Sequence, residues 1–289
     1  AGISHVLALS GMHVGIIWAV LGFLLRPIAL IRGGKWVKWI VSTSLLWIFA
    51  FVVGLEASVI RAVVMCMLME LAKLAGAKPL SLNTLAIAAV LMLLYHPFYL
   101  FDVGFQLSFV AVASIVFFFP LFFKIFREKG RLVRFLGGIM CVSVAAQLGT
   151  APLTMYYFSN FSVYFLLTNL VASVLVPVII VGTFVMMLVS PFPLLLNWSV
   201  IPINKIVQIL NDTARWVSEL PHASFSIASV SSVEIVVFYV LLAFMLLYVR
   251  KGRRRLLVGG IGMLALLLMV HVGMVFPKTR RAEIVFYHI

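Results

Sequence analysis

The sequence has 289 residues, of which 64% are hydrophobic and 10% are charged. Soluble domains average about 45–50% apolar and about 25% charged residues, so this composition excludes an ordinary water-soluble fold. The formal net charge of +14 would point to nucleic-acid binding in a soluble domain. In a membrane protein, part of such a charge sets the orientation of the helices, so charge alone does not identify a function here.

The chain starts at Ala1 rather than Met, without the basic and apolar segments and cleavage site of a signal peptide. We therefore expect an excerpt from a longer protein. Cys66 and Cys141 lie inside apolar runs. A buried thiol is the ordinary explanation for each, and we predict neither a disulfide nor a metal pair.

Apolar runs of about 20 residues, the length that crosses a bilayer as a helix, recur along the whole chain. We predict an all-α polytopic integral membrane protein, a bundle of about ten transmembrane helices, with a membrane domain over residues 1–281. The predicted spans are 13–31, 36–55, 57–75, 81–97, 101–123, 135–158, 161–190, 192–210, 233–249 and 256–276. The eighth leads into residues 204–220, a segment with the apolar face of an interfacial amphipathic helix.

Basic residues gather in four predicted loops, near 26–38, 73–78, 124–134 and 250–255. Lys and Arg are enriched in cytoplasmic loops. If the eighth span crosses the membrane, all four loops are cytoplasmic and both ends of the chain lie on the outer side. The basic residues between 278 and 281 do not fit this count.

A stripe of small residues near the start includes Gly11 and Gly15, a spacing that lets another helix approach closely. We assign Ser10, Gly11, His13 and Gly15 to a helix-packing motif. His5 and His13 do not have the spacing of two metal ligands on one helix face, and no carboxylate accompanies them. We predict no metal site.

Arg61 lies within the third apolar run, about 7 Å along the helix from its outer end at 1.5 Å per residue. An arginine at that depth is costly unless it is paired or faces water, so it is a candidate functional residue. Two structural alternatives remain open. The side chain could snorkel to the interface, or it could form an ion pair with Glu56 or Asp102.

Asp102, Gln106 and Phe109 share one face of the fifth span, and lipid would not accept the two polar side chains. Asp102 could instead cap the start of its helix. Asn169 adds an uncharged polar group in the seventh span. A helix–helix hydrogen bond would explain Asn169 as well as a pore lining does.

The segment from Gln147 to Pro152 predicts a broken helix in the middle of the sixth span, because Pro152 removes a backbone donor and Gly149 loosens the preceding turn. Thr150 could cap a second half-helix, whose N-terminal dipole would favour an anion such as phosphate. A plain proline kink is the alternative.

With the orientation given above, Arg61, Asp102, Gln106 and Asn169 lie within roughly 15 Å of the outer ends of their helices, and Gln147 lies near the midplane. Convergence of these side chains predicts a water-filled cavity that opens outward. The sequence contains no phosphate-binding loop, zinc-protease motif or nucleophile elbow. We expect no catalysis and no cofactor in this part of the chain.

Several short motifs resemble the competence domain of the ComEC family. They are Ser4-His-Val-Leu-Ala-Leu-Ser-Gly-Met-His-Val14, Ser58-Val-Ile-Arg-Ala62, Asp102-Val-Gly-Phe-Gln-Leu-Ser-Phe109 and Gln147-Leu-Gly-Thr-Ala-Pro152, followed by Asn169 and Pro177. Their order matches the family, and the resemblance covers about residues 1–190 well. Glu56 and His96 differ from the residues that are common in the family at those positions.

The resemblance implies a channel that passes single-stranded DNA across the bacterial inner membrane during natural transformation. It also implies an OB-like domain before this region and a β-lactamase-like domain after it, and the strand-like residues 282–289 are similar to the start of the latter. Implied partners are a cytoplasmic ATPase or single-strand-binding protein and an outer-side DNA receptor. Along the DNA path we place Arg61, Asp102, Gln106, Phe109, Gln147, Thr150 and Asn169.

The alternative function is a secondary transporter for a small solute or a lipid precursor. It would use the same cavity, with Arg61 and Asp102 as the coupling charges.

Overall fold

In the computed structural model, the described residues are 11–77, 81–221, 223–226, 231–251, 259–265 and 269. They fall into two compact units. The first comprises residues 1–150 and 161–225, and the second comprises residues 151–160 and 226–289. Ser10 and the predicted strand at 282–289 lie outside the described residues.

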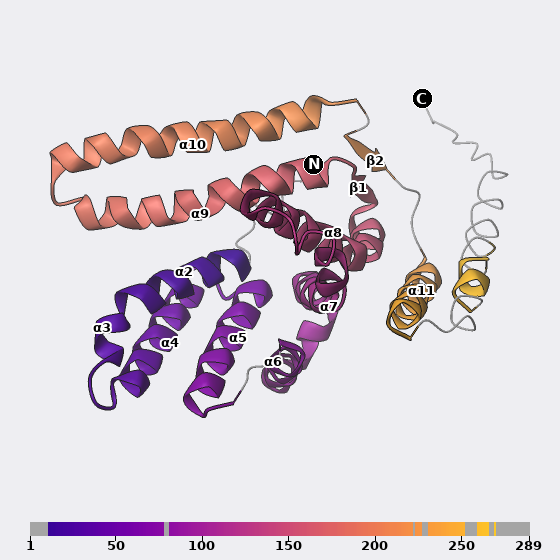
Figure 1. Ribbon diagram of the computed structural model, residues 1–289, viewed down its shortest axis with the longest axis horizontal. Coiled ribbons are helices and arrows are strands. Elements are labelled where there is room, and N and C mark those ends of the chain that lie inside the picture. The colour runs from indigo at the N-terminus through magenta and orange to yellow at the C-terminus, as the bar shows by residue number, and fades with distance from the viewer. Residues whose placement is uncertain are drawn as a thin grey trace, which may run out of the picture. The chain divides into compact units, whose positions relative to one another are not determined.

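The first unit is built almost entirely of helices (Figure 1). They are α2 (Gly11–Leu24), α3 (Arg26–Ala29), α4 (Gly34–Val52), α5 (Ala57–Leu74), α6 (Ser81–Tyr95), the 3-10 helix η1 (Pro97–Phe101), α7 (Val103–Phe123), most of α8 (Arg131–Phe158), α9 (Phe165–Val189) and α10 (Pro193–Glu219). Two short strands, β1 (Asn160–Ser162) and β2 (Ser224–Ser226), pair with each other. The sequence did not predict this pair.

Five helices in the described part of the chain are long and apolar enough to cross a membrane, namely α4, α7, α8, α9 and α11 (Ser232–Lys251). The residues of α2 and most of those of α6 form shorter apolar helices. These helices support the predicted class, an all-α membrane protein. The total of about ten spans stays a prediction.

The core of the first unit lies where α2, α4 and α5 pack together. Val14 of α2, Leu46 of α4 and Val59 and Val63 of α5 are almost completely buried there. Small side chains such as Ala50 let the helices come close. This packing fixes the positions of the polar side chains that α2 and α5 carry.

The first helix ends earlier than the predicted first span does. The sequence predicted one helix over 13–31, but α2 ends at Leu24, and the separate short helix α3 starts at Arg26 with Pro27 in its first turn. Proline fits the first turn of a helix, where its missing N–H would have no intrahelical partner. Pro27 therefore marks a new helix start rather than the interior of a span.

The interruption predicted between Gln147 and Pro152 is absent, because α8 continues from Arg131 to Phe158 with Pro152 inside it. Thr150 does not cap a half-helix, since its hydroxyl donates to the carbonyl of Ala146 at 3.0 Å. Hydroxyls that bond to neighbouring carbonyls help membrane helices to accommodate proline. The predicted second half-helix capped by Thr150, with its anion-binding N-terminus, is therefore wrong.

The predicted eighth span and the predicted amphipathic helix are one element. Helix α10 runs without interruption through Pro202 and through the whole of the segment at 204–219. It packs along α9 (Figure 1). Gly182 of α9 lies so close to Ile203 that an added Cβ would collide with that side chain. Helix α10 is not among the five candidate spans of the described residues, so the crossing predicted for 192–210 stays a prediction.

In the second unit, α11 starts after Ser231, whose backbone N–H donates to Glu234 at 2.6 Å. Residues 259–265 are helical, and Gly259 lies against the ring of Phe244 on α11. This helical stretch falls within the predicted last span, 256–276, of which the structure describes only part.

Candidate functional site

The candidate site is built around Arg61, which α5 carries in its second turn. The helix begins at Ala57, and the backbone N–H groups of Val59 and Ile60 bond to the carbonyl of Glu56. Arg61 is 7% exposed, although a guanidinium is the most polar group on this helix face. Snorkelling to the interface therefore does not explain its position.

The guanidinium of Arg61 lies between α2 and α7. Its Cζ atom is 5.9 Å from the ring centroid of Phe109 on α7. A Cβ added at Gly11 of α2 would lie 2.8 Å from Nη2, so Gly11 leaves the space that the guanidinium occupies. The guanidinium therefore has neighbours on both α2 and α7.

Arg61 has few polar contacts for a buried cation. Its Nε atom is buried without a hydrogen-bond partner. Within the described residues it forms no ion pair with Glu56 or Asp102, which removes the second structural alternative. A cation–π contact contributes about 0.5–2 kcal/mol, whereas an unpaired buried ion costs several kcal/mol. The contacts of Arg61 in the described structure therefore offset only part of the free-energy cost of burying its charge.

Asp102 and Gln106 organise the start of α7. Asp102 is the N-cap residue, and its Oδ1 atom accepts the backbone N–H of Phe105 at 2.6 Å. Gln106 donates its side-chain amide to the carbonyl of Leu100 at 2.8 Å. The capping role that we considered for Asp102 is confirmed. Both side chains hold the turn between η1 and α7, which sets the position of Phe109 further along the helix.

An aromatic row leads along this turn toward Arg61. The ring centroids of Tyr99 and Phe105 are 6.3 Å apart, and those of Phe105 and Phe109 are 4.3 Å apart. Phe105 is 5% exposed and packs with Ala57 and Met92, so it belongs to the core. Phe109 is half-buried and is the member of this row that contacts Arg61.

The other predicted path residues are not joined to Arg61 by hydrogen bonds in the described part of the chain. Gln147 and Asn169 are half-buried on α8 and α9. The carbonyl of Asn169 accepts a hydrogen bond from Ser173 at 2.5 Å. The structure therefore brings together Gly11, Arg61 and Phe109.

The glycines of the predicted helix-packing motif differ in how closely a neighbouring helix approaches them. Gly11 lies where α2 approaches α5, and a Cβ added to it would also lie 3.5 Å from the Cβ atom of Ala62. A Cβ at Gly15 would meet no atom of the described structure within 4 Å. His13 is half-buried beside them. Close approach at this helix pair therefore depends on Gly11 and not on Gly15.

A second polar cluster, which the sequence did not lead us to expect, surrounds Glu70 near the other end of α5. Its Oε1 atom lies 3.5 Å from Nζ of Lys38, and its Oε2 atom accepts from Trp18 at 3.2 Å and from Ser42 at 3.1 Å. The Nζ atom of Lys73 lies 5.2 Å from the centroid of a Trp18 ring. A carboxylate inside the third apolar run was the signal that could have identified this cluster.

No group of three or more His, Cys, Asp or Glu side chains is arranged as a metal site among the residues that the structure describes. The arrangement around Arg61 combines a buried cation, a ring face and a close helix contact. Such a site can hold or pass an anion.

The comparison with protein families decides the identity of the chain. A family model described as "Competence protein" matches residues 1–252. The chain belongs to the competence protein family. This assignment confirms the resemblance that the sequence motifs indicated.

Two curated proteins are similar to this competence protein. ComE operon protein 3 of Bacillus subtilis (strain 168) is 27% identical over 235 residues, which are 76% of this chain and 28% of that protein. An uncharacterized protein of Aquifex aeolicus (strain VF5) is 32% identical over 219 residues, which are 73% of this chain and 48% of that protein. The chain thus matches less than half the length of each relative. No solved structure matches it.

Proposed function

We propose that this chain forms the transmembrane part of a channel that passes single-stranded DNA across the bacterial inner membrane during natural transformation. Membership of the competence protein family supports this function, as does the similarity to ComE operon protein 3. The apolar helices supply the membrane domain that such a channel requires.

The observation that carries the proposal is the incompletely compensated charge of Arg61. A guanidinium that is 7% exposed and has an unpartnered Nε attracts any anion that can reach it. Single-stranded DNA brings one phosphate charge per nucleotide, and its path needs positive potential rather than one tight site. In this proposal Arg61 offsets each phosphate as it passes and then releases it.

The remaining path residues have supporting roles. Phe109 presents part of a ring beside the cation, and stacking on aromatic rings is a contact that every base can make. Gln147, Thr150 and Asn169 supply neutral hydrogen-bonding groups, which bind a strand too weakly to trap it. Asp102 and Gln106 hold the start of α7 and thereby position Phe109.

We assign no catalytic step to this chain, so the energy for transport has to come from partners. The expected partners are a cytoplasmic ATPase or single-strand-binding protein and an outer-side DNA receptor. OB-like and β-lactamase-like domains of the same protein would lie on the outer side, as would both ends of this chain. The basic loops would then face the cytoplasm.

A secondary transporter for a small solute or a lipid precursor has less support. That function uses Arg61 and Asp102 as coupled charges. In the described structure Asp102 caps α7 instead, and the two side chains form no ion pair. The contacts of Arg61 therefore favour an anion path over a coupled charge pair.

The test is transformation by the complete protein with Arg61→Gln. We expect transformation to fall by about 10- to 100-fold, since a hydrogen bond to a charged group contributes about 1.5–3 kcal/mol. Binding of DNA at the cell surface should not change, because it belongs to earlier components. Arg32→Gln, which removes a charge from an exposed loop, is the matched control and should transform normally. Normal transformation by a stably expressed Arg61→Gln protein would contradict the proposal.

The variant Asp102→Asn tests whether Arg61 and Asp102 act together as one charge pair or act separately. Asn is also a good N-cap residue, so the start of α7 should be retained. Because Arg61 and Asp102 do not pair, the losses from the two changes should multiply in the double variant. A strong loss from Asp102→Asn alone that does not add to the loss of Arg61→Gln in the double variant would show that the two residues act as a unit, as the transporter alternative requires.

A further inference from the structure

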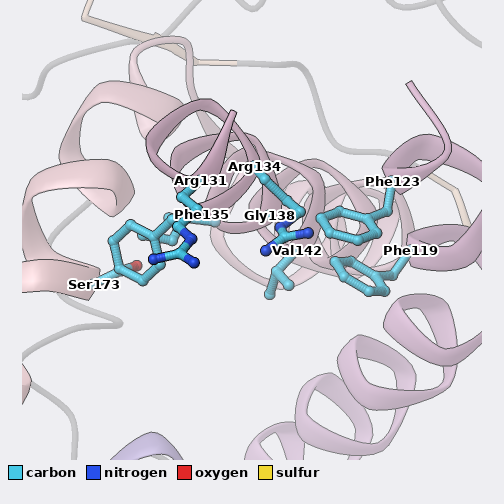
Figure 2. A pocket seen from close by; sticks show the side chains of 9 residues that line it. Phe119, Phe123, Arg131, Arg134, Phe135, Gly138, Val142 and Ser173 are labelled. Atoms are coloured by element: carbon cyan, nitrogen blue, oxygen red, sulfur yellow. The ribbon is translucent and has the colours of Figure 1, made fainter. Parts of the chain in front are cut away.

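A pocket that the proposed DNA path does not use lies between α7, α8 and α9 (Figure 2). Its volume is about 580 Å³. Phe119 and Phe123 of α7 lie at one end of it and Ser173 of α9 at the other, with Arg131 and Arg134 of α8 along it (Figure 2). The pocket therefore combines aromatic walls with two cations.

The two arginines of the pocket do not serve the stability of α8. The helix begins at Arg131, and its first turn holds no acidic residue. The N-terminus of a helix carries a partial positive charge, so cations in the first turn oppose the helix dipole. Both side chains are exposed, and neither forms an ion pair within the described residues. A bound anion would offset both charges and the dipole together.

The rest of the pocket is apolar and extends along α8. Phe135, Ile139 and Val142 continue the lining from Arg131 into the apolar part of the helix, over about 16 Å at 1.5 Å per residue. Phe135 and Val142 are also exposed, 59% and 39% respectively, on α8, a helix long and apolar enough to cross a membrane. The pocket lining thus has two cations at the start of α8 and apolar side chains further along the same helix.

We propose that this pocket binds one anionic phospholipid. Arg131 and Arg134 hold the phosphate of its headgroup, and one acyl chain lies along Phe135, Ile139 and Val142. Arginine forks match phosphate oxygens, and basic pockets between membrane helices on the cytoplasmic side are suited to anionic headgroups. The loop before α8 adds Lys124, Arg127 and Lys129, which raise the local concentration of anionic lipid.

A nucleic acid fits this pocket less well than a lipid does. Among the lining residues, Ser173 is the one uncharged polar side chain, and its hydroxyl already donates to Asn169. Sugars and phosphates along a strand would need more polar partners at the depth of Ile139 and Val142. Two arginines that would attract an anionic headgroup, followed along α8 by apolar side chains that would contact an acyl chain, match a single lipid molecule.

The test uses the complete protein in phosphatidylcholine vesicles that contain a small fraction of spin-labelled phosphatidylglycerol or, in parallel, spin-labelled phosphatidylcholine. The measured quantity is the motionally restricted fraction of each label. The wild type should restrict phosphatidylglycerol preferentially. Arg131→Gln with Arg134→Gln should lower that preference by about 10- to 30-fold, since each cation near a membrane surface contributes a factor of about five.

Two matched variants separate a specific pocket from general surface charge. Lys124→Gln with Lys129→Gln also removes two positive charges, but from the segment before α8, and neither lysine lines the pocket. This variant should keep most of the preference. Gly138→Leu keeps all the arginines and fills the pocket, because a Cβ there meets only ordinary contact with Phe123 at 3.5 Å. It should lower the preference.

Three results would overturn the lipid assignment. The arginine variant could retain the preference of the wild type, or the lysine variant could lose as much as the arginine variant does. Alternatively, an unlabelled single-stranded oligonucleotide could displace the restricted phosphatidylglycerol from the wild type and fail to bind the arginine variant, which would assign the pocket to nucleic acid.

Discussion

Helix α5 carries two ionisable side chains in very different surroundings. Glu70 accepts hydrogen bonds from Trp18 and Ser42 and pairs with Lys38, so side chains of α2 and α4 satisfy it. Arg61 is more deeply buried, has an unpartnered Nε and contacts a ring face and a glycine. A charge whose requirements are met within the fold contributes to packing, whereas a buried charge left without hydrogen-bond partners is a candidate for contact with a ligand.

The comparison predicts opposite effects of charge removal on stability. Glu70→Gln should lower the free energy of unfolding by about 2 kcal/mol, because it leaves Lys38 unpaired in a partly buried position. Denaturant unfolding of the purified protein in mild detergent measures this change. Glu56→Gln, at an exposed residue before α5, is the control and should leave stability unchanged. If Glu70→Gln has the same free energy of unfolding as the wild type, the cluster around Glu70 does not contribute to the stability of the fold.

Arg61→Gln should leave the unfolding free energy unchanged or raise it, even though transformation falls. Removal of a buried and incompletely compensated charge relieves a desolvation cost, and glutamine retains part of the side chain's volume. The same unfolding measurement applies to this variant. A loss of stability as large as that of Glu70→Gln would show that Arg61 is a packing residue, and the contrast between the two ends of α5 would disappear.

A smaller effect is expected at the glycines of α2. A Cβ at Gly11 would displace the tip of Arg61, which is flexible, so Gly11→Ala should reduce transformation only about 2- to 3-fold while the helix itself becomes more favourable. Gly15→Ala has the same effect on the helix and meets no neighbour within 4 Å in the described structure. Transformation frequency, normalised to protein level, compares the two. If Gly11→Ala and Gly15→Ala change the transformation frequency equally, the contact of Gly11 with Arg61 has no role in transport.

Hydropathy predicted the helices of this chain well where each one follows a clear break. The third span was expected at 57–75 and α5 is Ala57–Leu74, while the fifth was expected at 101–123 and α7 is Val103–Phe123. The start of α7 carries a local signal, since Asp102 caps it. Such signals depend on neighbouring residues and can be read from sequence.

The positions of proline residues did not predict where the helices of this chain are interrupted. Pro152 and Pro202 both lie inside continuous helices, although each removes a backbone donor. Neighbouring helices and nearby hydroxyls can preserve a membrane helix around a proline. The sequence shows Pro152 but does not show what surrounds it, and therefore the predicted break in α8 was wrong.

The candidate site was only partly predictable. Arg61 was identified because an arginine in an apolar run is rare at any position. Its contacts with Gly11 and Phe109 join residues far apart in the chain, and they depend on how α2, α5 and α7 pack. Glu70 was missed for the same reason, since Lys38 and Ser42, which satisfy it, lie on a different helix.

A photo-crosslinking measurement would test whether DNA passes beside Arg61. A photoreactive amino acid replaces Phe109 in the complete protein, and cells that take up labelled DNA are illuminated during transport. Trp47, an exposed residue on α4, carries the same group in the control. We predict that labelled single strands crosslink at position 109 and not at position 47. Transformation that continues without any crosslink at 109, or with equal crosslinking at both positions, would contradict a DNA path beside Arg61.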